Sequence, residues 1–418
     1  MFSKGTFAWG VSTSSYQAED PGVKPGDPDY FQTDWDVALI KHGKAPPKGN
    51  ALSAWTHGAP ALKAVKKIGL THYRFSVEWA RVEPQPGVYN EAAIARYAQA
   101  AKELKVAGVE PIACLWHFTF PSWLYNEKKP NASNWLHPDA RKRWQAFVKK
   151  MVTALAPHVR AYAPQNEPNG QLAMAYLAAM WPPAKHLEFF TYKKALAECI
   201  AHFRDAAKII KSIRKDAIII SVHALPWWKE GVMDVAHLLY KEVEHTNYDH
   251  MDGVMDVCDI VGINYYYSQV ISPISYFTVG TYRGPHYSVM GWRIDPQGFY
   301  NQIKFVGDRY KKPMMITENG IATSHDTKRV RYMQEHLCAM KKAMDEGYDV
   351  RGYFVWSLAD NYEWHYGYKA RFGLSRVNPK TFERELKPSA YYYRDIIKKG
   401  VGALKGKKGK ITSTIRQS

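Results

Sequence analysis

The sequence predicts a single-domain α/β protein with a (β/α)8 TIM barrel fold. Eight short runs rich in β-branched and aromatic residues alternate with amphipathic helical segments along the chain. The 418 residues, 46% of them hydrophobic, are enough for one large barrel or for two ordinary domains. Neither a linker rich in Pro, Gly or Ser nor a short-period repeat divides the chain. These observations favour one barrel over residues 1–400.

The predicted strands are short apolar runs, each of which leads into polar residues. In chain order they are TFAWGVS (6–12), THYRFSV (71–77), VEPIACLW (109–116), VRAYAPQ (159–165), AIIISVH (217–223), IVGINYY (260–266), PMMITEN (313–319) and VRGYFVWS (350–357). Helices are predicted at 58–69, 90–108 and 329–347, where apolar residues recur at helical spacing. The last two segments end in the glycine that is expected just past a helix C-terminus.

The charge is strongly basic, with 57 Lys and Arg against 39 Asp and Glu, a net of +18. Such a charge favours anionic surfaces or nucleic acid where it is clustered. The clearest cluster is residues 401–418, which we predict to be a basic, flexible C-terminal tail. Elsewhere the basic residues fall on predicted helix faces, so we expect no nucleic-acid partner. The sequence does not indicate an oligomeric state.

The cysteine pattern points to a reducing compartment. Four cysteines lie far apart, with neither a CxxC pair nor a metal-ligand spacing: Cys114, Cys199, Cys258 and Cys338. The N-terminus lacks the apolar core of a signal peptide, and no run approaches the roughly 18 apolar residues of a membrane span. We therefore expect a cytoplasmic protein without a transmembrane segment and without a metal.

Two carboxylates stand where the chemistry of such a barrel lies, at the C-terminal ends of the strands. Glu167 follows the fourth run and Glu318 lies near the end of the seventh. These strands face each other across a closed eight-stranded barrel, so both side chains can point into one mouth. Facing carboxylates cleave glycosidic bonds: one protonates the leaving oxygen, and the other attacks the anomeric carbon or activates water. A separation of about 5–5.5 Å predicts retention, and roughly 6.5–9.5 Å predicts inversion.

The residue types around this pair suit a sugar. Four aromatic residues near strand ends offer flat apolar faces to a pyranose: Trp116, Trp356, Trp364 and Phe372. Four polar residues are candidates for hydrogen bonds to its hydroxyls: Gln17, His117, Asn166 and Glu363. Arg74 and Tyr266 are candidates for keeping Glu318 ionised, because a neighbouring cation lowers a carboxyl pKa. Glu167 must instead keep its proton, which a dry pocket and a nearby negative charge favour.

With these motifs the chain resembles the family 1 glycoside hydrolases, which include β-glucosidases and β-galactosidases. NEP at 166–168 resembles the acid/base motif of the family, and ITENG at 316–320 resembles its nucleophile motif. GYFVWSLADNYEWHYGYKARFGL at 352–374 is similar to its eighth-strand signature, and YRFSVEW and GINYYY match at their expected places. The likeness covers nearly the whole chain apart from the tail.

The resemblance implies a β-glucosidase-like hydrolase that acts on β-glucosides, β-galactosides or β-fucosides by a retaining double displacement. Glu318 is then the nucleophile of a covalent glycosyl-enzyme intermediate, and Glu167 acts first as acid and then as base. No cofactor is implied. By position, the residues in contact with the nonreducing sugar are Gln17, His117, Asn166, Glu363 and Trp364, with Trp356 as its platform. Gly320 is expected to let the chain turn away from the strand.

The chain also departs from the family pattern. Phe118 follows His117 where the family usually has Trp, and Thr119 stands where Asp is common. Loss of an indole N–H removes one hydroxyl contact, so the sugar preference stays open. Pro164 replaces the usual threonine before the acid/base motif. Short loops near the mouth predict an open side for the leaving group, whose identity is also open.

Two alternatives remain. The first is the 6-phospho-β-glycosidase branch of the family, which the charge of +18 superficially supports. That branch holds the phosphate with Ser, Lys and Tyr, whereas Trp364, Ala370 and Phe372 stand at the corresponding positions here. The second is a catalytically inert sugar-binding member of the family. The presence of both Glu167 and Glu318 argues against it.

Overall fold

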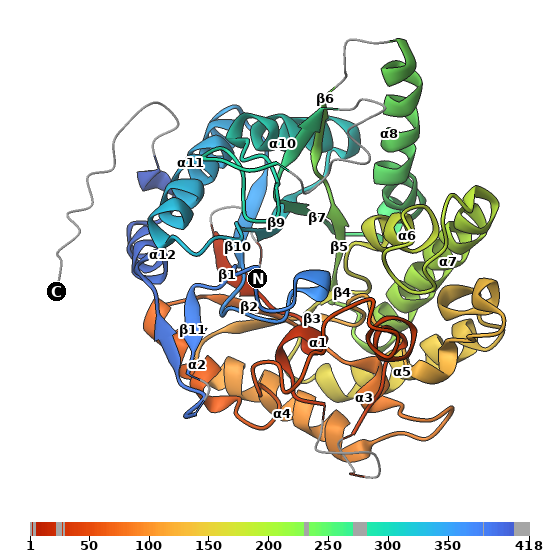
Figure 1. Cartoon of the computed structure of the whole chain (residues 1–418). Helices are drawn as coiled ribbons and strands as arrows, with labels where there is room; N and C mark the ends of the chain where they lie inside the picture. Colours follow the sequence, from red (N-terminus) through yellow and green to blue (C-terminus); the bar gives the residue numbers. More distant parts are fainter. Residues whose placement is uncertain are drawn as a thin grey trace.

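The predicted strands close into one barrel at the centre of the molecule (Figure 1). The structure is a computed structural model that describes residues 2, 6–21, 27, 30–229, 234–270, 282–378 and 380–404. Parallel strands follow one another around the barrel in the order β1, β10, β9, β7, β5, β4, β3 and β2. The prediction of a single-domain (β/α)8 barrel is confirmed.

The barrel strands correspond to the eight predicted runs. They are β1 (Ala8–Ser12), β2 (His72–Ser76), β3 (Glu110–Cys114), β4 (Ala161–Ala163), β5 (Ile218–Ala224), β7 (Ile260–Tyr265), β9 (Met314–Asn319) and β10 (Val350–Trp356). The shortest is β4, which ends before Pro164, a residue without an N–H for the ladder. Two small sheets were not predicted: β6 (Trp227–Lys229) with β8 (Ser268–Val270), and β11 (Ser375–Val377) with β12 (Arg384–Leu386).

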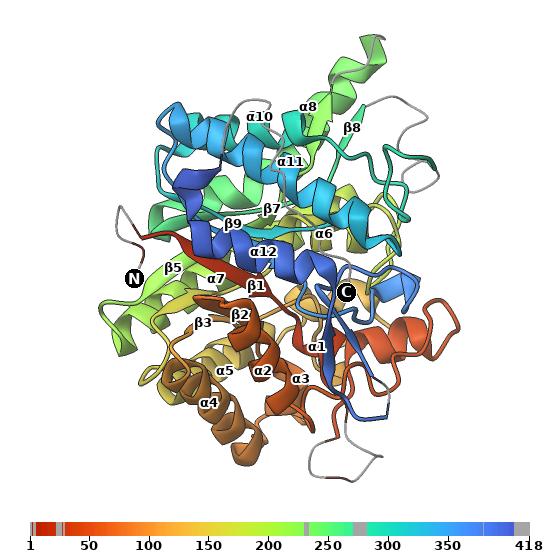
Figure 2. The same cartoon turned by 90° about the vertical axis from the view of Figure 1, so that its left-hand side faces the viewer.

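Helices surround the barrel, as Figures 1 and 2 show. The longer ones are α2 (Ala59–Ile68), α4 (Glu91–Val106), α5 (Ala140–Leu155), α7 (Phe189–Ile213), α8 (Asp234–Val254), α10 (Pro296–Tyr310), α11 (Asp326–Asp345) and α12 (Pro388–Lys399). Short α-helices are α1 (Ser15–Ala18), α3 (Trp79–Val82) and α6 (Pro168–Tyr176). Single turns are η1 (Asp36–Ile40), η2 (Ser122–Leu124), η3 (Pro130–Ala132), η4 (Asn134–Leu136), η5 (Met255–Val257), η6 (Trp364–Tyr366) and η7 (Val401–Ala403). Gly108 and Gly347 follow α4 and α11 with φ of +77° and +100°, as helix-ending glycines should.

The core has two layers, one inside the barrel and one between the barrel and the helices. The inner cluster consists mainly of Ala8, Ile112, Cys114, Ala161, Ala163, Ile220, Val222, Ile260, Met315 and Phe354. The outer cluster is larger and takes the alternate strand residues, such as Val261, Ile263, Ile316 and Val355. Because successive strand residues point to opposite faces, this alternation decides which side chains can reach the barrel mouth.

The C-terminal part of the described chain stays packed on the barrel slightly beyond residue 400. The turn η7 follows α12, and Leu404 is buried in the outer cluster. Residues 405–418, which hold most of the predicted basic tail, lie outside the described residues, and their flexibility stays a prediction. Within the described ranges, no helix is long and apolar enough to cross a membrane.

The four cysteines all lie in the part of the chain that the structure describes. Cys114, Cys199 and Cys258 are buried, Cys338 is half-buried, and all four are free thiols. Burial raises the pKa of Cys199 well above its usual range, which keeps this thiol protonated. Over the described part of the chain, no group of three or more His, Cys, Asp or Glu side chains is arranged to hold a metal ion.

Candidate active site

Glu318 projects from the end of β9 into the barrel mouth, where its carboxylate has two strong donors. The Arg74 Nη1 donates to Oε1 at 2.6 Å, and the Tyr266 hydroxyl donates to Oε2 at 2.5 Å. Arg74 is fully buried in β2, and Glu318 is 3% exposed. A buried cation and a phenol on the two oxygens leave the carboxylate anionic and fixed in one orientation.

Glu167 lies on the turn between β4 and α6 and keeps partial access to solvent. The Asn264 Nδ2 donates to its Oε1 at 2.6 Å. Asn264 is paired with Glu318 in the β7–β9 register, and its Oδ1 accepts from the Thr317 hydroxyl at 2.6 Å. Asn264 on β7 therefore contacts both Glu167 and the strand that carries Glu318.

The two glutamates are also connected through Asn166. Its Oδ1 accepts from the Arg74 Nη2 at 2.5 Å and from the Asn264 Nδ2 at 3.3 Å. Arg74 thus contacts Glu318 with one nitrogen and Asn166 with the other, while Asn264 contacts both Asn166 and Glu167. The structure brings the predicted carboxylates into one hydrogen-bonded network.

The environments of the two carboxyls favour the protonated form of Glu167 and the ionised form of Glu318. Burial, followed by the negative charge of Glu318, raises the pKa of Glu167 to about 8. Burial also raises the pKa of Glu318, but Arg74 and then Tyr266 oppose this effect. The groups that stabilise a negative charge lie at Glu318, whereas Glu167 has only an amide N–H. At neutral pH the proton therefore resides on Glu167 and the charge on Glu318.

The Asn166 amide also determines the tautomer of His117. Because its oxygen faces Arg74, its Nδ2 faces the His117 Nε2 at 3.3 Å and donates to it. The His117 ring is then neutral with its proton on Nδ1. Burial and, after it, Arg74 lower the pKa of His117 well below its usual range, in agreement with this assignment. The buried Nδ1 has no protein partner among the described residues.

Gln17 and Glu363 form a second polar pair in the mouth. The Gln17 Nε2 donates to the Tyr362 carbonyl at 2.8 Å and to the Glu363 Oε2 at 3.1 Å. The Gln17 Oε1 is buried without a partner in the described chain. Burial, followed by the charge of Glu318, raises the pKa of Glu363 to about 8. A carboxyl and an amide oxygen side by side suit two adjacent hydroxyls of a sugar.

Aromatic rings line this region. Trp356, at the end of β10, stacks against His117 with ring centroids 5.8 Å apart. Phe372 packs against Tyr266 at 5.8 Å and belongs to an apolar cluster with Trp356. Trp364 stacks on Tyr16 at 5.5 Å and 7°, and it also contacts Trp35, Phe118 and Trp181. These contacts leave Trp364 6% exposed.

One expectation is wrong. Trp116 does not face the mouth but packs outside the barrel among Phe120 and Trp135, because strand alternation sends it opposite to His117. Gly320 directly follows β9, and the structure gives it a further role. A Cβ on Gly320 would lie 2.2 Å from the Trp356 carbonyl oxygen, so the glycine permits close approach of two strand ends.

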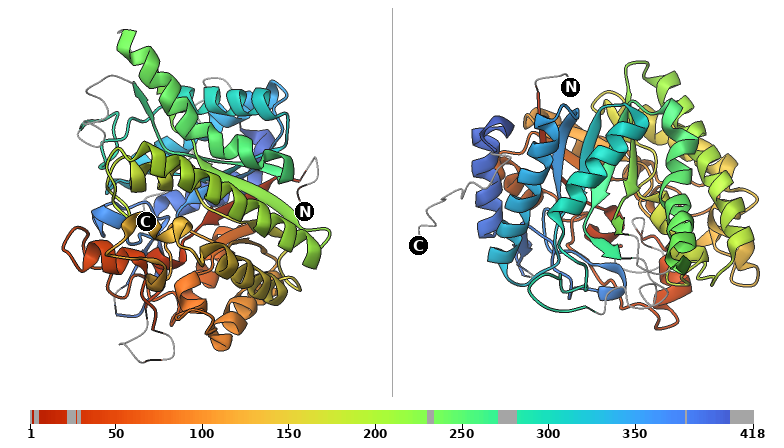
Figure 3. Two further views of the ribbon diagram at one scale, coloured as in Figure 1. Left: turned by 90° about the vertical axis from the view of Figure 1, so that its right-hand side faces the viewer. Right: turned by 90° about the horizontal axis from the view of Figure 1, so that it is seen from above.

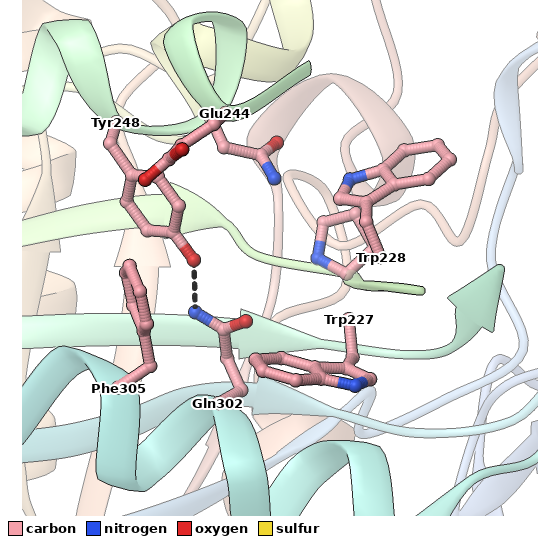
Figure 4. A pocket seen from close by; sticks show the side chains of 8 residues that line it. Trp227, Trp228, Glu244, Tyr248, Gln302 and Phe305 are labelled. Atoms are coloured by element: carbon pink, nitrogen blue, oxygen red, sulfur yellow. Dashed lines mark hydrogen bonds between the residues drawn. The ribbon is translucent and has the colours of Figure 1, made fainter. Parts of the chain in front are cut away.

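A hollow elsewhere on the barrel rim is separate from the carboxylates. It lies between β6, α8 and α10 and is lined by Trp227, Trp228 and Gln302, among others (Figure 4). The Gln302 Nε2 donates there to the Tyr248 hydroxyl at 2.8 Å. The hollow contains none of the predicted site residues.

Comparison with known proteins decides the family. The model described as Glycosyl hydrolase family 1 matches residues 2–230 and 229–401. The chain belongs to glycosyl hydrolase family 1. Similar curated proteins include the β-galactosidase of Sulfolobus acidocaldarius, 27% identical over 94% of this chain and 94% of its own. The bifunctional β-D-glucosidase/β-D-fucosidase of Bifidobacterium breve is 27% identical over 95% of this chain and 98% of its own. The crystal structure of a hyperthermophilic β-glucosidase from Pyrococcus furiosus superposes with a TM-score of 0.85 at 25% identity, covering 95% and 96% of the two chains.

As a member of family 1, the protein is a glycoside hydrolase with the β-glycosidase activity of that family. Sequence reasoning missed Asn264 and Thr317 as parts of the carboxylate network. Both occupy the ends of barrel strands, Asn264 two residues before Tyr266 and Thr317 directly before Glu318, and this position was the available signal. The Thr317 hydroxyl reaches Asn264 only because β7 and β9 are neighbours in the barrel.

Proposed function

We propose that this family 1 glycoside hydrolase cleaves β-glycosides with retention of configuration, with Glu318 as nucleophile and Glu167 as acid/base. The observation that carries the proposal is the unequal support of the two carboxyls. Glu318 has Arg74 and Tyr266 on its two oxygens, whereas Glu167 has a single amide donor. A charged nucleophile opposite a protonated acid is the resting state that a double displacement requires.

In the first step Glu318 attacks the anomeric carbon while Glu167 gives its proton to the leaving oxygen. The glycosyl-enzyme intermediate that forms neutralises the Glu318 charge, and this removes one cause of the raised pKa of Glu167. Glu167 is then a carboxylate that can accept a proton from the incoming water. Water attack releases the sugar and returns both residues to their starting states.

The sugar class follows from the polar pair and from the relatives. Gln17 and Glu363 offer acceptors for adjacent hydroxyls, and the His117 Nδ1–H offers a donor. Relatives named as glucosidase, fucosidase and galactosidase support β-glucosides, β-fucosides or β-galactosides as small-molecule substrates. Trp356 supplies the apolar platform. We also infer a cytoplasmic location, which the free cysteines support.

The 6-phospho-β-glycoside alternative has poor support in the local structure. Ala370 and Phe372 are each 1% exposed and pack with Met290 and Trp356 in an apolar cluster. A phosphate placed against this wall would lose hydration without gaining a cation. The net charge of +18 is a property of the whole chain and does not compensate for this.

A panel of nitrophenyl β-glycosides, phosphorylated and not, tests the substrate class. Hydrolysis of the unphosphorylated glucoside, galactoside or fucoside is the expected result. No turnover of any member would favour an inert sugar-binding protein, and selective turnover of the phosphorylated sugars would favour the alternative branch.

The roles of the two glutamates are tested by substitution. Glu318→Ala should abolish hydrolysis, and azide should restore turnover of an activated substrate as the glycosyl azide of inverted configuration, because a small anion fills the vacated space. Glu167→Ala should slow substrates with poor leaving groups far more than activated ones, since only the former need protonation. Absence of azide rescue, or equal losses on both substrate types, would contradict these assignments.

A further inference from the structure

The acid/base segment is anchored from outside the barrel by a chain of buried polar side chains. Gln165, which directly precedes the NEP motif, reaches toward α7 and α8, which pack together along the side of the barrel (Figure 3). It contacts Cys199 on α7 and His250 on α8, and His250 contacts His223 on β5. All four residues are 0% exposed. The double displacement proposed above uses none of them directly.

One carbonyl determines the direction of every hydrogen bond in this chain. The Cys199 C=O can only accept, so the Gln165 Nε2 faces it at 3.1 Å. The Gln165 Oε1 consequently faces the His250 Nε2, at 3.1 Å, and this nitrogen donates. The His250 Nδ1 then accepts from the His223 Nε2 at 3.0 Å. The His250 imidazole is therefore neutral. Burial lowers the pKa of His250 to about 3 and that of His223 well below its usual range, so both rings are neutral at neutral pH.

A second anchor holds the other side of the segment. Asn169 accepts from the Ala224 N–H at 3.1 Å and donates to the Ala224 C=O at 2.7 Å, closing a ring with the end of β5. Between the two anchors, the Glu167 N–H donates to the Val222 carbonyl at 2.9 Å.

The residue between these anchors has an unusual backbone. Glu167 has φ of +45° and ψ of +49°, in the left-handed region that is sterically unfavourable for a residue with a Cβ. Such a conformation persists only where the surroundings enforce it. In this conformation its Oε1 lies 2.6 Å from the Asn264 Nδ2. A relaxation of the backbone at Glu167 would move the carboxyl away from this partner.

We propose that Gln165, His250 and His223 are positioning residues that hold Glu167 in its left-handed conformation and so aim its carboxyl at the leaving-group oxygen. This inference rests on the proposed acid/base function of Glu167. Gln165 supplies the attachment, because its hydrogen bonds to Cys199 and His250 join the strand end to two helices. His250 donates to the Gln165 Oε1, His223 donates to His250, and the two rings fill the space behind the amide.

The test uses Gln165→Met, which keeps the length of the side chain and removes its donor and acceptor. We expect kcat/KM for a phenyl β-glycoside to fall about tenfold to a hundredfold, because catalysis is sensitive to displacements near 1 Å. The leaving group of the 2,4-dinitrophenyl β-glycoside needs no protonation, so kcat/KM of the variant for this substrate should fall much less. The alkaline limb of the pH profile for the phenyl glycoside should also move. Active-site titration with a 2-deoxy-2-fluoro glycoside counts competent sites and removes the contribution of misfolded protein.

Two further variants keep the test decisive if Gln165→Met folds poorly. His223→Leu removes the donor to His250 at the far end of the chain and should show the same leaving-group dependence. His223→Gln retains an N–H that can donate to the His250 Nδ1 and should recover most of the lost activity. Failure of His223→Gln to do better than His223→Leu would argue against the hydrogen-bond chain.

His202→Phe is the matched control. His202 is also 0% exposed and lies on α7, where its Nδ1 contacts the Glu198 carbonyl of its own helix at 2.6 Å. The His202→Phe variant should lose the same fraction of its activity on both substrates, or none. An equal loss on both substrates in Gln165→Met overturns the positioning role if Glu167→Ala shows leaving-group dependence in the same assay. Without that dependence in Glu167→Ala, the proposed function itself fails.

Discussion

Replacement of Arg74 by Met tests whether the buried cation keeps the nucleophile ionised. The Arg74 side chain is 0% exposed, and its Nη1 lies 2.6 Å from the Glu318 Oε1. A neighbouring opposite charge lowers a carboxyl pKa by about 1–3 units. Loss of this charge should therefore move the acid limb of activity to higher pH by about 1–3 units. Because one unit corresponds to tenfold, kcat/KM below the shifted limb should fall about 10- to 1,000-fold.

The assay is the pH dependence of kcat/KM for a 2,4-dinitrophenyl β-glycoside. This leaving group needs no proton from Glu167, so the alkaline limb is suppressed and the acid limb reports Glu318. Arg81→Met is the control, because Arg81 is also 0% exposed and pairs with Glu19 at 3.0 Å outside the carboxylate network. Both variants should lose stability, by about 3–5 kcal/mol for a broken buried pair. An acid limb that is the same in Arg74→Met, Arg81→Met and wild type would refute the reasoning.

Two other predictions follow from the mouth residues. Burial and the charge of Glu318 raise the pKa of Glu363 from 4.5 to about 8, so this carboxyl destabilises the fold increasingly as pH rises between these values. Glu363→Gln should increase the free energy of unfolding by up to about 5 kcal/mol at pH 8 and by little at pH 4.5, measured by urea denaturation; an equal change at both pH values would contradict the shift. Gly320→Ala should lower kcat/KM about tenfold or more, because the new Cβ would displace the Trp356 backbone. Gly402→Ala is its control, because a Cβ at this position would meet nothing within 4 Å, and it should leave kcat/KM unchanged.

The barrel and the carboxylate pair were predictable from local patterns. Each strand appears as an apolar run, and the ends of parallel strands meet at one face, so Glu167 and Glu318 could be assigned to one mouth from chain order. Trp116 was assigned to the wrong face, because strand alternation sends it outward, opposite to His117. Which backbone lies against Gly320 could not be predicted, because the Trp356 carbonyl comes from a strand distant in sequence.

The positioning chain behind Glu167 had no comparable signal. Gln165, His223 and His250 are separated by tens of residues. Taken singly, none of them stands in a sequence pattern that indicates a function. Their contacts exist only because β4, β5 and α8 converge behind the turn that carries Glu167. A hydrogen-bond chain of this kind is a property of three packed elements.

The amino-acid sequence by itself determined the barrel, its order of elements and the identity of the acidic pair, because periodicity and motif are local and survive without coordinates. Only the tertiary structure showed which contacts make Glu167, rather than Glu318, the carboxyl that holds the proton. That choice depends on the burial of both groups and on Arg74, which reaches Glu318 from a strand 244 residues away. A pKa is set by everything within a few ångströms, and that neighbourhood exists only once the barrel has closed.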